Sequence, residues 1–259
     1  KKPPHIVLEN MSFTVERGQY VSLLGPSGCG KTTLLTMMGG FLTPDAGEII
    51  LAGNKVEKPG PDRGFVFQNY ALFPWMTVKE NILYSLQVKK LSKQEQNKRL
   101  HELLEISHLF GSENKYPVQL SGGMQQRVAV VRALASRPEI LLLDEPLGAV
   151  DFQMRELLQE ELAALVEGAK TTVVMVTHDV NESVYLSDRV IVMSADRGQI
   201  VKDVYIGLDR PRDRQSEDFK AYVSELTELV RQAFREKNVE LQPDFVQKDV
   251  NDNMQTNFT

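Results

Sequence analysis

Short apolar runs alternate with segments of helical periodicity along most of the chain. Each run has the length of a strand that is covered on both faces. The runs cover residues 21–24, 64–67, 140–143, 171–176 and 189–193. Because strands that alternate with helices usually form parallel sheets, the pattern predicts an α/β fold with a mostly parallel sheet.

The stretch from residue 77 to residue 136 departs from this alternation, because it contains no convincing strand. Thr77 with Glu80, and Ser92 with Glu95, have the spacing of capping boxes that begin helices. The second helix gains an apolar face from Leu100, Leu103, Leu104 and Ile106. A third helix is expected to begin near Gly122 and to stop before Pro138. We therefore expect a helical subdomain at about 77–136, inserted into the α/β core.

Other segments extend this picture toward both ends of the chain. Residues 12–15 resemble a further strand, in which Phe13 would face the core, and Asp179 with Glu182 predicts a third capping box. Residues 218–236 have the pattern of an amphipathic helix. The polar residues 239–259 are expected to form a flexible tail behind a single domain over residues 1–238.

The composition is that of an ordinary folded protein of 259 residues, with 42% hydrophobic and 25% charged residues. It excludes a disordered chain, a collagen and a coiled-coil rod, and a net charge of −5 argues against a bulk nucleic-acid binder. One cysteine cannot form an intrachain disulfide, and no apolar run approaches the ~18–20 residues that cross a bilayer. The chain opens at Lys1 without a methionine, so we expect the natural start to be missing.

The glycine-rich segment after the apolar run 21–24 fits the pattern G-x-x-x-x-G-K-[ST]. Its residues are Gly25, Pro26, Ser27, Gly28, Cys29, Gly30, Lys31 and Thr32, and Thr33 follows. Glycines let backbone N–H groups surround phosphates, and the helix N-terminus adds a positive dipole. The lysine reaches the β- and γ-phosphates, and the threonine hydroxyl binds Mg²⁺. The alternative is a strand–helix turn without a ligand, but the flanking strand and helix favour a nucleotide-binding P-loop.

Two carboxylates, Asp144 and Glu145, end the apolar run 140–143. In α/β folds, ligand groups lie at such strand ends. Asp144 can hold Mg²⁺ through water, and Glu145 can polarise a water in line with the γ-phosphate. Alone, the pair would be read as solvated acids that terminate a strand, but the P-loop upstream favours a catalytic role.

Residues 120–127 read Leu-Ser-Gly-Gly-Met-Gln-Gln-Arg, and they resemble the LSGGQ-type signature of ABC-transporter ATPases, with Met124 in place of the usual glutamine. Ser121 would cap a helix that begins with Gly122 and Gly123, which exposes N–H groups and a positive dipole. A plain helix N-cap is the simpler alternative. The resemblance implies that this segment closes on the γ-phosphate held by the P-loop of a second subunit.

Three further positions match the same family. Gln68 resembles the Q-loop glutamine that touches Mg²⁺ and the attacking water, and His178 resembles the switch histidine that contacts the γ-phosphate. Asp151 resembles the D-loop aspartate at the dimer interface, with Val150 in place of the usual leucine before it. The resemblance runs from about Ile6 to Ala233. It implies a P-loop ATPase core with an antiparallel β portion beside the parallel sheet, and ATP and Mg²⁺ as ligands.

One family feature is missing, namely the aromatic residue that stacks on adenine ahead of the P-loop. No Phe, Tyr or Trp precedes Phe13. Either the natural N-terminus has been lost, or His5 or another group substitutes for the aromatic ring.

Residues 60–64, 67–75 and 210–214 resemble the nitrate/sulfonate/taurine group of bacterial importers. This resemblance implies an ATPase subunit that pairs with a second copy or a close paralogue, docks on an integral membrane permease, and meets an extracytoplasmic solute-binding protein only indirectly. It places the protein on the cytoplasmic face of the bacterial inner membrane and implies no nucleic acid partner. The rivals are a soluble ABC ATPase of the DNA-repair or translation type, and a P-loop kinase.

The loop after Gln68 carries five large apolar or aromatic side chains. They are Tyr70, Leu72, Phe73, Trp75 and Met76. Such a cluster is costly to leave in water and usually marks a partner surface. We expect a groove that receives a short helix of the membrane subunit, and the alternative is that all five side chains pack internally.

Overall fold

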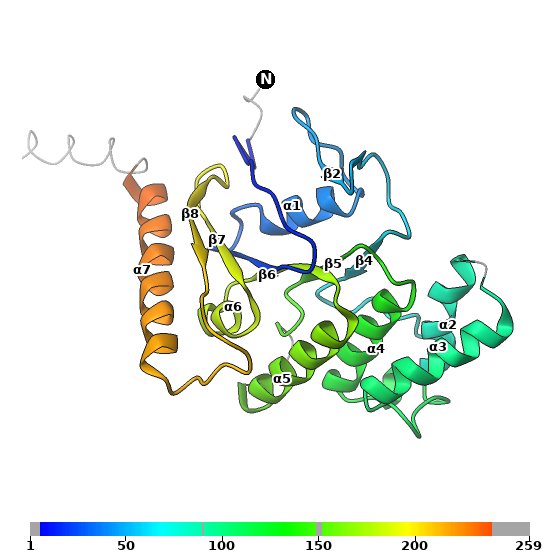
Figure 1. Cartoon of the computed structure of the whole chain (residues 1–259). Coiled ribbons are helices and arrows are strands. Elements are labelled where there is room, and N and C mark those ends of the chain that lie inside the picture. Colours follow the sequence, from blue (N-terminus) through cyan, green and yellow to red (C-terminus); the bar gives the residue numbers. More distant parts are fainter. Residues whose placement is uncertain (1–5, 90, 149–151, 240–259) are drawn as a thin grey trace, which may run out of the picture.

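The computed structural model describes residues 6–89, 91–148 and 152–239, and its central feature is a six-stranded sheet (Figure 1). The strand order is β4-β5-β6-β1-β7-β8. The strands are β1 (Tyr20–Leu24), β4 (Arg63–Val66), β5 (Ile140–Asp144), β6 (Thr172–Thr177), β7 (Arg189–Met193) and β8 (Ile200–Tyr205). All neighbours pair in parallel except β7 and β8, which are antiparallel. The predicted α/β fold, mostly parallel with an antiparallel portion, is confirmed.

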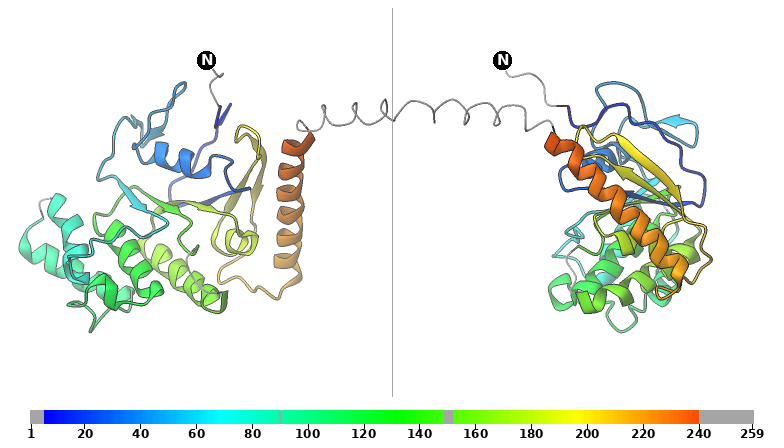
Figure 2. Two further views of the ribbon diagram at one scale, coloured as in Figure 1. Left: turned by 180° about the vertical axis from the view of Figure 1, so that it is seen from behind. Right: turned by 90° about the vertical axis from the view of Figure 1, so that its left-hand side faces the viewer.

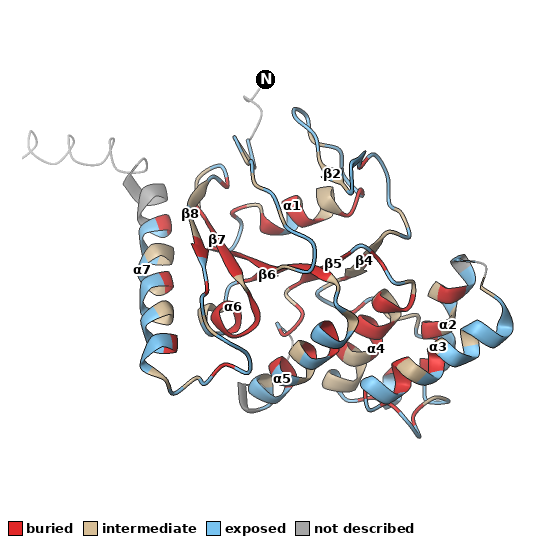
Figure 3. Ribbon diagram, in the orientation of Figure 1, coloured by how far each residue is buried: buried red, intermediate tan, exposed pale blue. Residues whose placement is uncertain are grey.

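Both faces of the central strands are buried, as their uninterrupted apolar sequences predict (Figure 3). One face packs against α1 (Lys31–Met38) and the N-terminal segment, and Leu23, Leu142 and Val174 point into that layer. The opposite face is covered by the helices that follow β4 in the chain, which are described below. The parallel register brings the carboxyl ends of β1, β4, β5 and β6 to one edge of the sheet, where ligand groups of α/β folds gather.

The predicted helical subdomain is present between β4 and β5. It contains α2 (Val78–Val88), α3 (Lys93–Ile106), the short 3₁₀ helix η1 (Pro117–Gln119) and α4 (Gly122–Ala135). Thr77 and Ser92 cap α2 and α3 through complete capping boxes with Glu80 and Glu95. On α3, three of the four predicted apolar positions are buried, whereas Ile106 is exposed.

The remaining helices are α5 (Phe152–Ala169), α6 (Val180–Leu186) and α7 (Glu217–Val239). Helix α7 packs against β7 and α6 at the end of the molecule opposite α2 and α3 (Figure 2). It buries Phe219, Leu226 and Ala233 along one stripe, which confirms the amphipathic pattern. In the described ranges, no helix combines the length and the hydropathy needed to cross a membrane. The tail was predicted at residues 239–259; Val239 is the last residue of α7, and residues 240–259 lie outside the described part of the chain.

The prediction of a strand at residues 12–15 is wrong, because no neighbouring strand pairs with this segment within the described residues. Phe13 nevertheless packs against the core, as expected. The sequence pattern also missed a short hairpin of β2 (Ile50–Leu51) and β3 (Asn54–Lys55). A mainly apolar cavity of about 700 Å³ lies between this hairpin, α1 and the segment around Phe13.

Candidate nucleotide-binding site

The P-loop lies between β1 and α1, where the sequence placed it. Gly28 and Gly30 have φ angles of 79° and 96°, in the left-handed region that favours glycine. A Cβ atom on Gly25 would lie 2.7 Å from the carbonyl oxygen of Met193, so a side chain does not fit there without a shift. The loop can therefore bring its backbone N–H groups close to a ligand, which is the property a phosphate cradle requires.

Lys31 is folded across this loop. Its ammonium group donates hydrogen bonds to the carbonyl oxygens of Gly25 at 2.8 Å and of Pro26 at 2.7 Å, and it is buried. Cys29 is also buried, and its Sγ lies 3.8 Å from the Lys31 Nζ. Ser27, Gly28 and Thr32 are exposed, so the outer side of the loop is open. A buried cation behind an open glycine loop suits an anionic ligand.

Thr32 and Asp144 meet at the foot of the loop. The Thr32 hydroxyl donates a hydrogen bond of 2.9 Å to the Asp144 carboxylate, so the first turn of α1 contacts the end of β5. Burial raises the pKa of Asp144, and the Thr32 hydrogen bond opposes that shift. A hydroxyl and a carboxylate are the hard oxygen donors that Mg²⁺ prefers, so these residues fit the predicted metal role.

Glu145 is held between two side chains from neighbouring strands. Gln68, which follows β4, donates through Nε2 to the Glu145 Oε2 at 3.0 Å, and the His178 Nδ1 lies 3.4 Å from Oε1. The Glu145 N–H donates to the Val176 carbonyl oxygen at 3.0 Å, which ties the end of β5 to β6. Its φ of 45° is uncommon for a residue with a side chain, and strained backbone of this kind clusters at functional sites. The structure thus brings together all three residues predicted to be catalytic.

The signature segment begins α4 in the helical subdomain. The Ser121 hydroxyl accepts a hydrogen bond from the Met124 N–H at 3.3 Å, as the predicted N-cap requires. A Cβ atom on Gly122 would meet open space, whereas one on Gly123 would meet Leu158. Within the described part of the chain, no hydrogen bond joins this segment to the P-loop. Asp151, the predicted D-loop residue, lies outside the described residues.

The contact between Thr177 and Glu182 beside His178 was not predicted from the sequence. The predicted capping box at Asp179 is only half formed. The Asp179 carboxylate caps α6 by accepting from the Glu182 N–H at 3.0 Å, but the Glu182 side chain accepts from the Thr177 hydroxyl instead of from the Asp179 N–H. The capping-box spacing was the available signal, and the competing threonine explains why it misled.

The aromatic loop after Gln68 is divided between core and surface. Tyr70 is buried, whereas Trp75 is 69% exposed. Phe73 is intermediate in burial. Its ring centroid lies 5.7 Å from that of Trp75 and 4.9 Å from that of Tyr84. The alternative that all five side chains pack internally is therefore wrong, although it holds for Tyr70.

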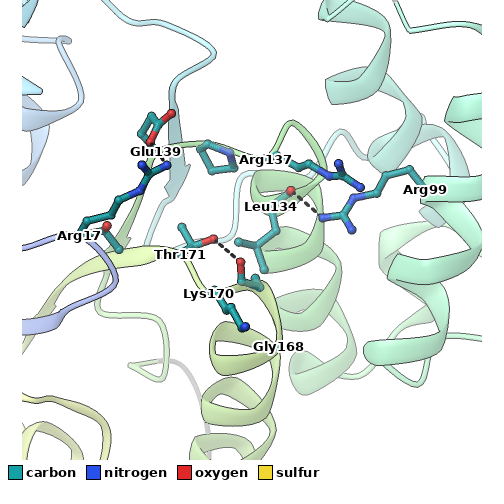
Figure 4. A pocket seen from close by; sticks show the side chains of 11 residues that line it. Arg17, Arg99, Leu134, Arg137, Glu139, Gly168, Lys170 and Thr171 are labelled. Atoms are coloured by element: carbon teal, nitrogen blue, oxygen red, sulfur yellow. Dashed lines mark hydrogen bonds and ion pairs between the residues drawn. The ribbon is translucent and has the colours of Figure 1, made fainter. Parts of the chain in front are cut away.

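A separate polar cavity of about 380 Å³ lies at the other edge of the sheet, before the start of β5 and β6 (Figure 4). Arg17, Arg99, Arg137 and Lys170 line it. Arg99 donates to the Leu134 carbonyl oxygen near the end of α4, and Arg17 pairs with Glu139. Cations beside helix C-termini complement the helix dipoles, so we assign this cavity a structural role.

Comparison with known proteins agrees with this geometry. Residues 8–148 match the ABC transporter family. The aliphatic sulfonates import ATP-binding protein SsuB of Bacillus thuringiensis is 47% identical over 83% of this chain and 84% of its own length. The nitrate import ATP-binding protein NrtD of Synechococcus elongatus is 44% identical over 82% of this chain and 79% of its own.

A solved structure extends the agreement to three dimensions. A dimeric ATP-binding cassette in a post-hydrolysis state, bound to ADP and phosphate, superposes with a TM-score of 0.69 and 34% sequence identity. The match covers 81% of this chain and 94% of that chain. The fold and the site define a P-loop nucleotide-hydrolysing domain. The chain belongs to the ABC transporter family, as an ATP-binding cassette that hydrolyses ATP.

Proposed function

We propose that this cassette powers solute uptake by a bacterial ABC importer, with an anion of the nitrate, sulfonate or taurine type as its solute. The observation that carries the catalytic part is the Glu145 carboxylate, held between Gln68 and His178 beside the Thr32–Asp144 pair. The importer part is supported by the relatives that are named for sulfonate and nitrate import.

The P-loop binds the phosphates of ATP. Backbone N–H groups of the loop would surround them, and Lys31 would turn from the Gly25 and Pro26 carbonyl oxygens to the β- and γ-phosphates. Thr32, Asp144 and Gln68 would hold Mg²⁺, Asp144 through water; the hydrogen bond between Thr32 and Asp144 supports this assignment. The ion would neutralise charge that develops on the phosphate oxygens.

Hydrolysis then depends on three side chains at the carboxyl edge of the sheet. Glu145 takes a proton from the water that attacks the γ-phosphate, and Gln68 orients that water. His178 donates to the γ-phosphate, where negative charge accumulates. Since Gln68 and His178 both contact Glu145, a change at any of the three disturbs the others.

A second copy of the cassette completes the site. The exposed N-terminus of α4, with Ser121, Gly122 and Gly123, is a second anion site in a chain that has its own P-loop elsewhere. We propose that two copies pack head to tail, so that this segment closes on the nucleotide of the partner and Asp151 lies at the interface. A close paralogue of this chain could take the place of the second copy.

The aromatic surface formed by the exposed Trp75 and Tyr84 and the half-buried Phe73 is proposed to receive a helix of an integral membrane permease. The loop that carries Phe73 and Trp75 begins just after Gln68, so the docked helix would follow the state of the nucleotide. In this arrangement the cassette lies on the cytoplasmic face of the inner membrane, and an extracytoplasmic solute-binding protein acts through the permease. No observation favours the soluble ABC ATPase alternative.

The Glu145→Gln variant tests the catalytic part of the proposal. It is expected to bind ATP and to accumulate as a closed dimer, while turnover falls at least ~10²-fold because the general base is lost. Glu139→Gln, one residue before the opposite end of the same strand, is the matched control and should retain turnover. ATP hydrolysis by the Glu145 variant at nearly the wild-type rate would remove Glu145 from this role.

A further inference from the structure

A buried carboxyl group, which the proposed mechanism does not use, lies beside the loop that carries His178. Glu182, on the first turn of α6, is 3% exposed. Its Oε2 accepts a hydrogen bond from the Thr177 hydroxyl, and its Oε1 has no hydrogen-bond partner among the described residues. A buried, half-satisfied carboxyl group costs free energy, and such groups concentrate at functional sites.

Hydrogen bonds connect this carboxyl group to both neighbours of His178. The Thr177 hydroxyl, which donates to Glu182, accepts from the Asp179 N–H at 3.0 Å. The Asp179 carboxylate accepts from the Glu182 N–H at 3.0 Å, and its other oxygen accepts from the Arg155 Nη1 at 3.1 Å. The backbone on each side of His178 is therefore fixed to the first turn of α6, and Asp179 is also fixed to α5.

The His178 side chain has little packing of its own to fix it, because it is 54% exposed. Its distance of 3.4 Å from the Glu145 Oε1 then depends on where the backbone places the ring. Small errors in such a position are costly, because a misplacement of ~1 Å can lower a rate about 100-fold.

Titratable groups surround Glu182 on several sides. Those that face it are Asp179 on its own helix cap, Arg155 on α5, Glu145 after β5 and Tyr20 on β1. Burial, together with Asp179 and Glu145, raises the pKa of Glu182 to about 7, and the Thr177 hydroxyl and Arg155 oppose the shift. A carbonyl oxygen of the neutral group accepts a hydrogen bond as the carboxylate does, so the link to Thr177 does not require the charge.

We propose that Glu182 is a positioning residue for ATP hydrolysis: through Thr177 and Asp179 it holds His178 against Glu145. Glu182 does not touch the nucleotide, and the feature that matters is the oxygen that accepts from Thr177. The inference rests on the proposed role of His178 at the γ-phosphate.

Steady-state ATPase kinetics on two pairs of variants test this proposal. Glu182→Ala removes the acceptor and Thr177→Val removes the donor, so each should lower kcat about 10- to 100-fold. The KM for ATP should stay within about two-fold, because the P-loop contacts are untouched. Glu182→Gln keeps an acceptor oxygen and Thr177→Ser keeps the hydroxyl, so each should recover most of the lost kcat. Ser183→Ala, a buried change on the same helix turn, is the control for general disturbance of α6.

The His178→Ala background separates positioning from a merely structural effect. If Glu182 acts through His178, Glu182→Ala should lower kcat no further in that background, since interacting residues are not additive. A further loss equal to that in the wild type would overturn the proposal, as would Glu182→Gln being as slow as Glu182→Ala. If Glu182→Ala does not fold, the Thr177→Val and Thr177→Ser pair carries the same test.

The same measurements separate this inference from the proposed function. An active His178→Ala variant would refute the proposed role of His178 and, with it, this inference. A slow His178→Ala variant beside unchanged Glu182→Ala and Thr177→Val variants would refute the positioning role alone.

Discussion

Replacing Glu182 with glutamine is expected to change how the stability of the fold depends on pH. In the unfolded chain the carboxyl group has its ordinary pKa of 4.5, whereas burial raises the pKa to about 7 in the folded chain. Between these two values the folded chain retains a proton that the unfolded chain has released. The stabilisation is therefore fully present below about pH 4.5, falls as the pH rises, and is lost above about pH 7.

The size of this effect follows from the two pKa values. Their difference, from 4.5 to about 7, corresponds to about 3 kcal/mol at ~1.36 kcal/mol per unit, of which about 2.5 kcal/mol falls between pH 5 and pH 8. This is a large share of the ~5–15 kcal/mol by which a typical domain is stable.

Urea unfolding of the wild type and of Glu182→Gln at several pH values between 5 and 8, at constant salt and without nucleotide, measures the difference. The free energy of unfolding of the wild type, minus that of the variant, should fall by about 2.5 kcal/mol across this range. The absolute stability of the variant is not the criterion, because its amide introduces a buried donor. A difference that stays constant with pH would refute the reasoning. In the Glu139→Gln control, the free energy of unfolding should depend on pH as it does in the wild type.

Three further predictions concern the P-loop, the dimer and the aromatic surface. Cys29 should react slowly with N-ethylmaleimide because it is buried, and bound ATP should slow it further; equal labelling with and without ATP, followed by mass spectrometry, would contradict this. The ATPase activity per molecule should rise with protein concentration, and mixing Lys31→Ala with Ser121→Arg copies should restore at most one working site per dimer; strictly proportional activity at great dilution would contradict a shared site. The Trp75→Ala, Phe73→Ser double variant should fold and bind ATP yet lose permease binding and uptake. Loss of folding would contradict this prediction, because it would show that the fold itself needs these side chains.

Most of the sheet and the whole helical subdomain could be predicted from the sequence, because local signals specify them. Strands buried on both faces leave uninterrupted apolar runs, and Thr77 and Ser92 begin helices by hydrogen bonds within one turn. The strand expected at residues 12–15 shows the limit of such signals. The pattern correctly predicted that Phe13 packs against the core, but a strand also needs a neighbouring strand, which a local pattern does not specify.

The site, too, could be predicted only in part. Motif spacing was sufficient to group Lys31, Thr32, Asp144 and Glu145, because a P-loop and the end of a neighbouring parallel strand share one edge of a sheet. The tertiary contacts around His178 were not predictable in this way. The Glu182 side chain could accept a hydrogen bond either from the Asp179 N–H or from the Thr177 hydroxyl. Which donor it takes depends on how the side chain is buried, and the local sequence does not specify that.

The pairing of β5 with β6 has a consequence for changes in chain length. Asp144 lies opposite Val176. The next residue on one chain segment is Glu145, and on the other it is Thr177, which is followed by His178. Inserting one residue within β6 would advance the loop by ~3.3 Å and turn every later side chain of the strand to the other face. Insertions and deletions should therefore be tolerated in the exposed turn at Lys170, which precedes β6. Between Thr172 and Thr177 they should abolish activity. A library of single-residue insertions, selected for ATP-driven uptake, would reveal this boundary.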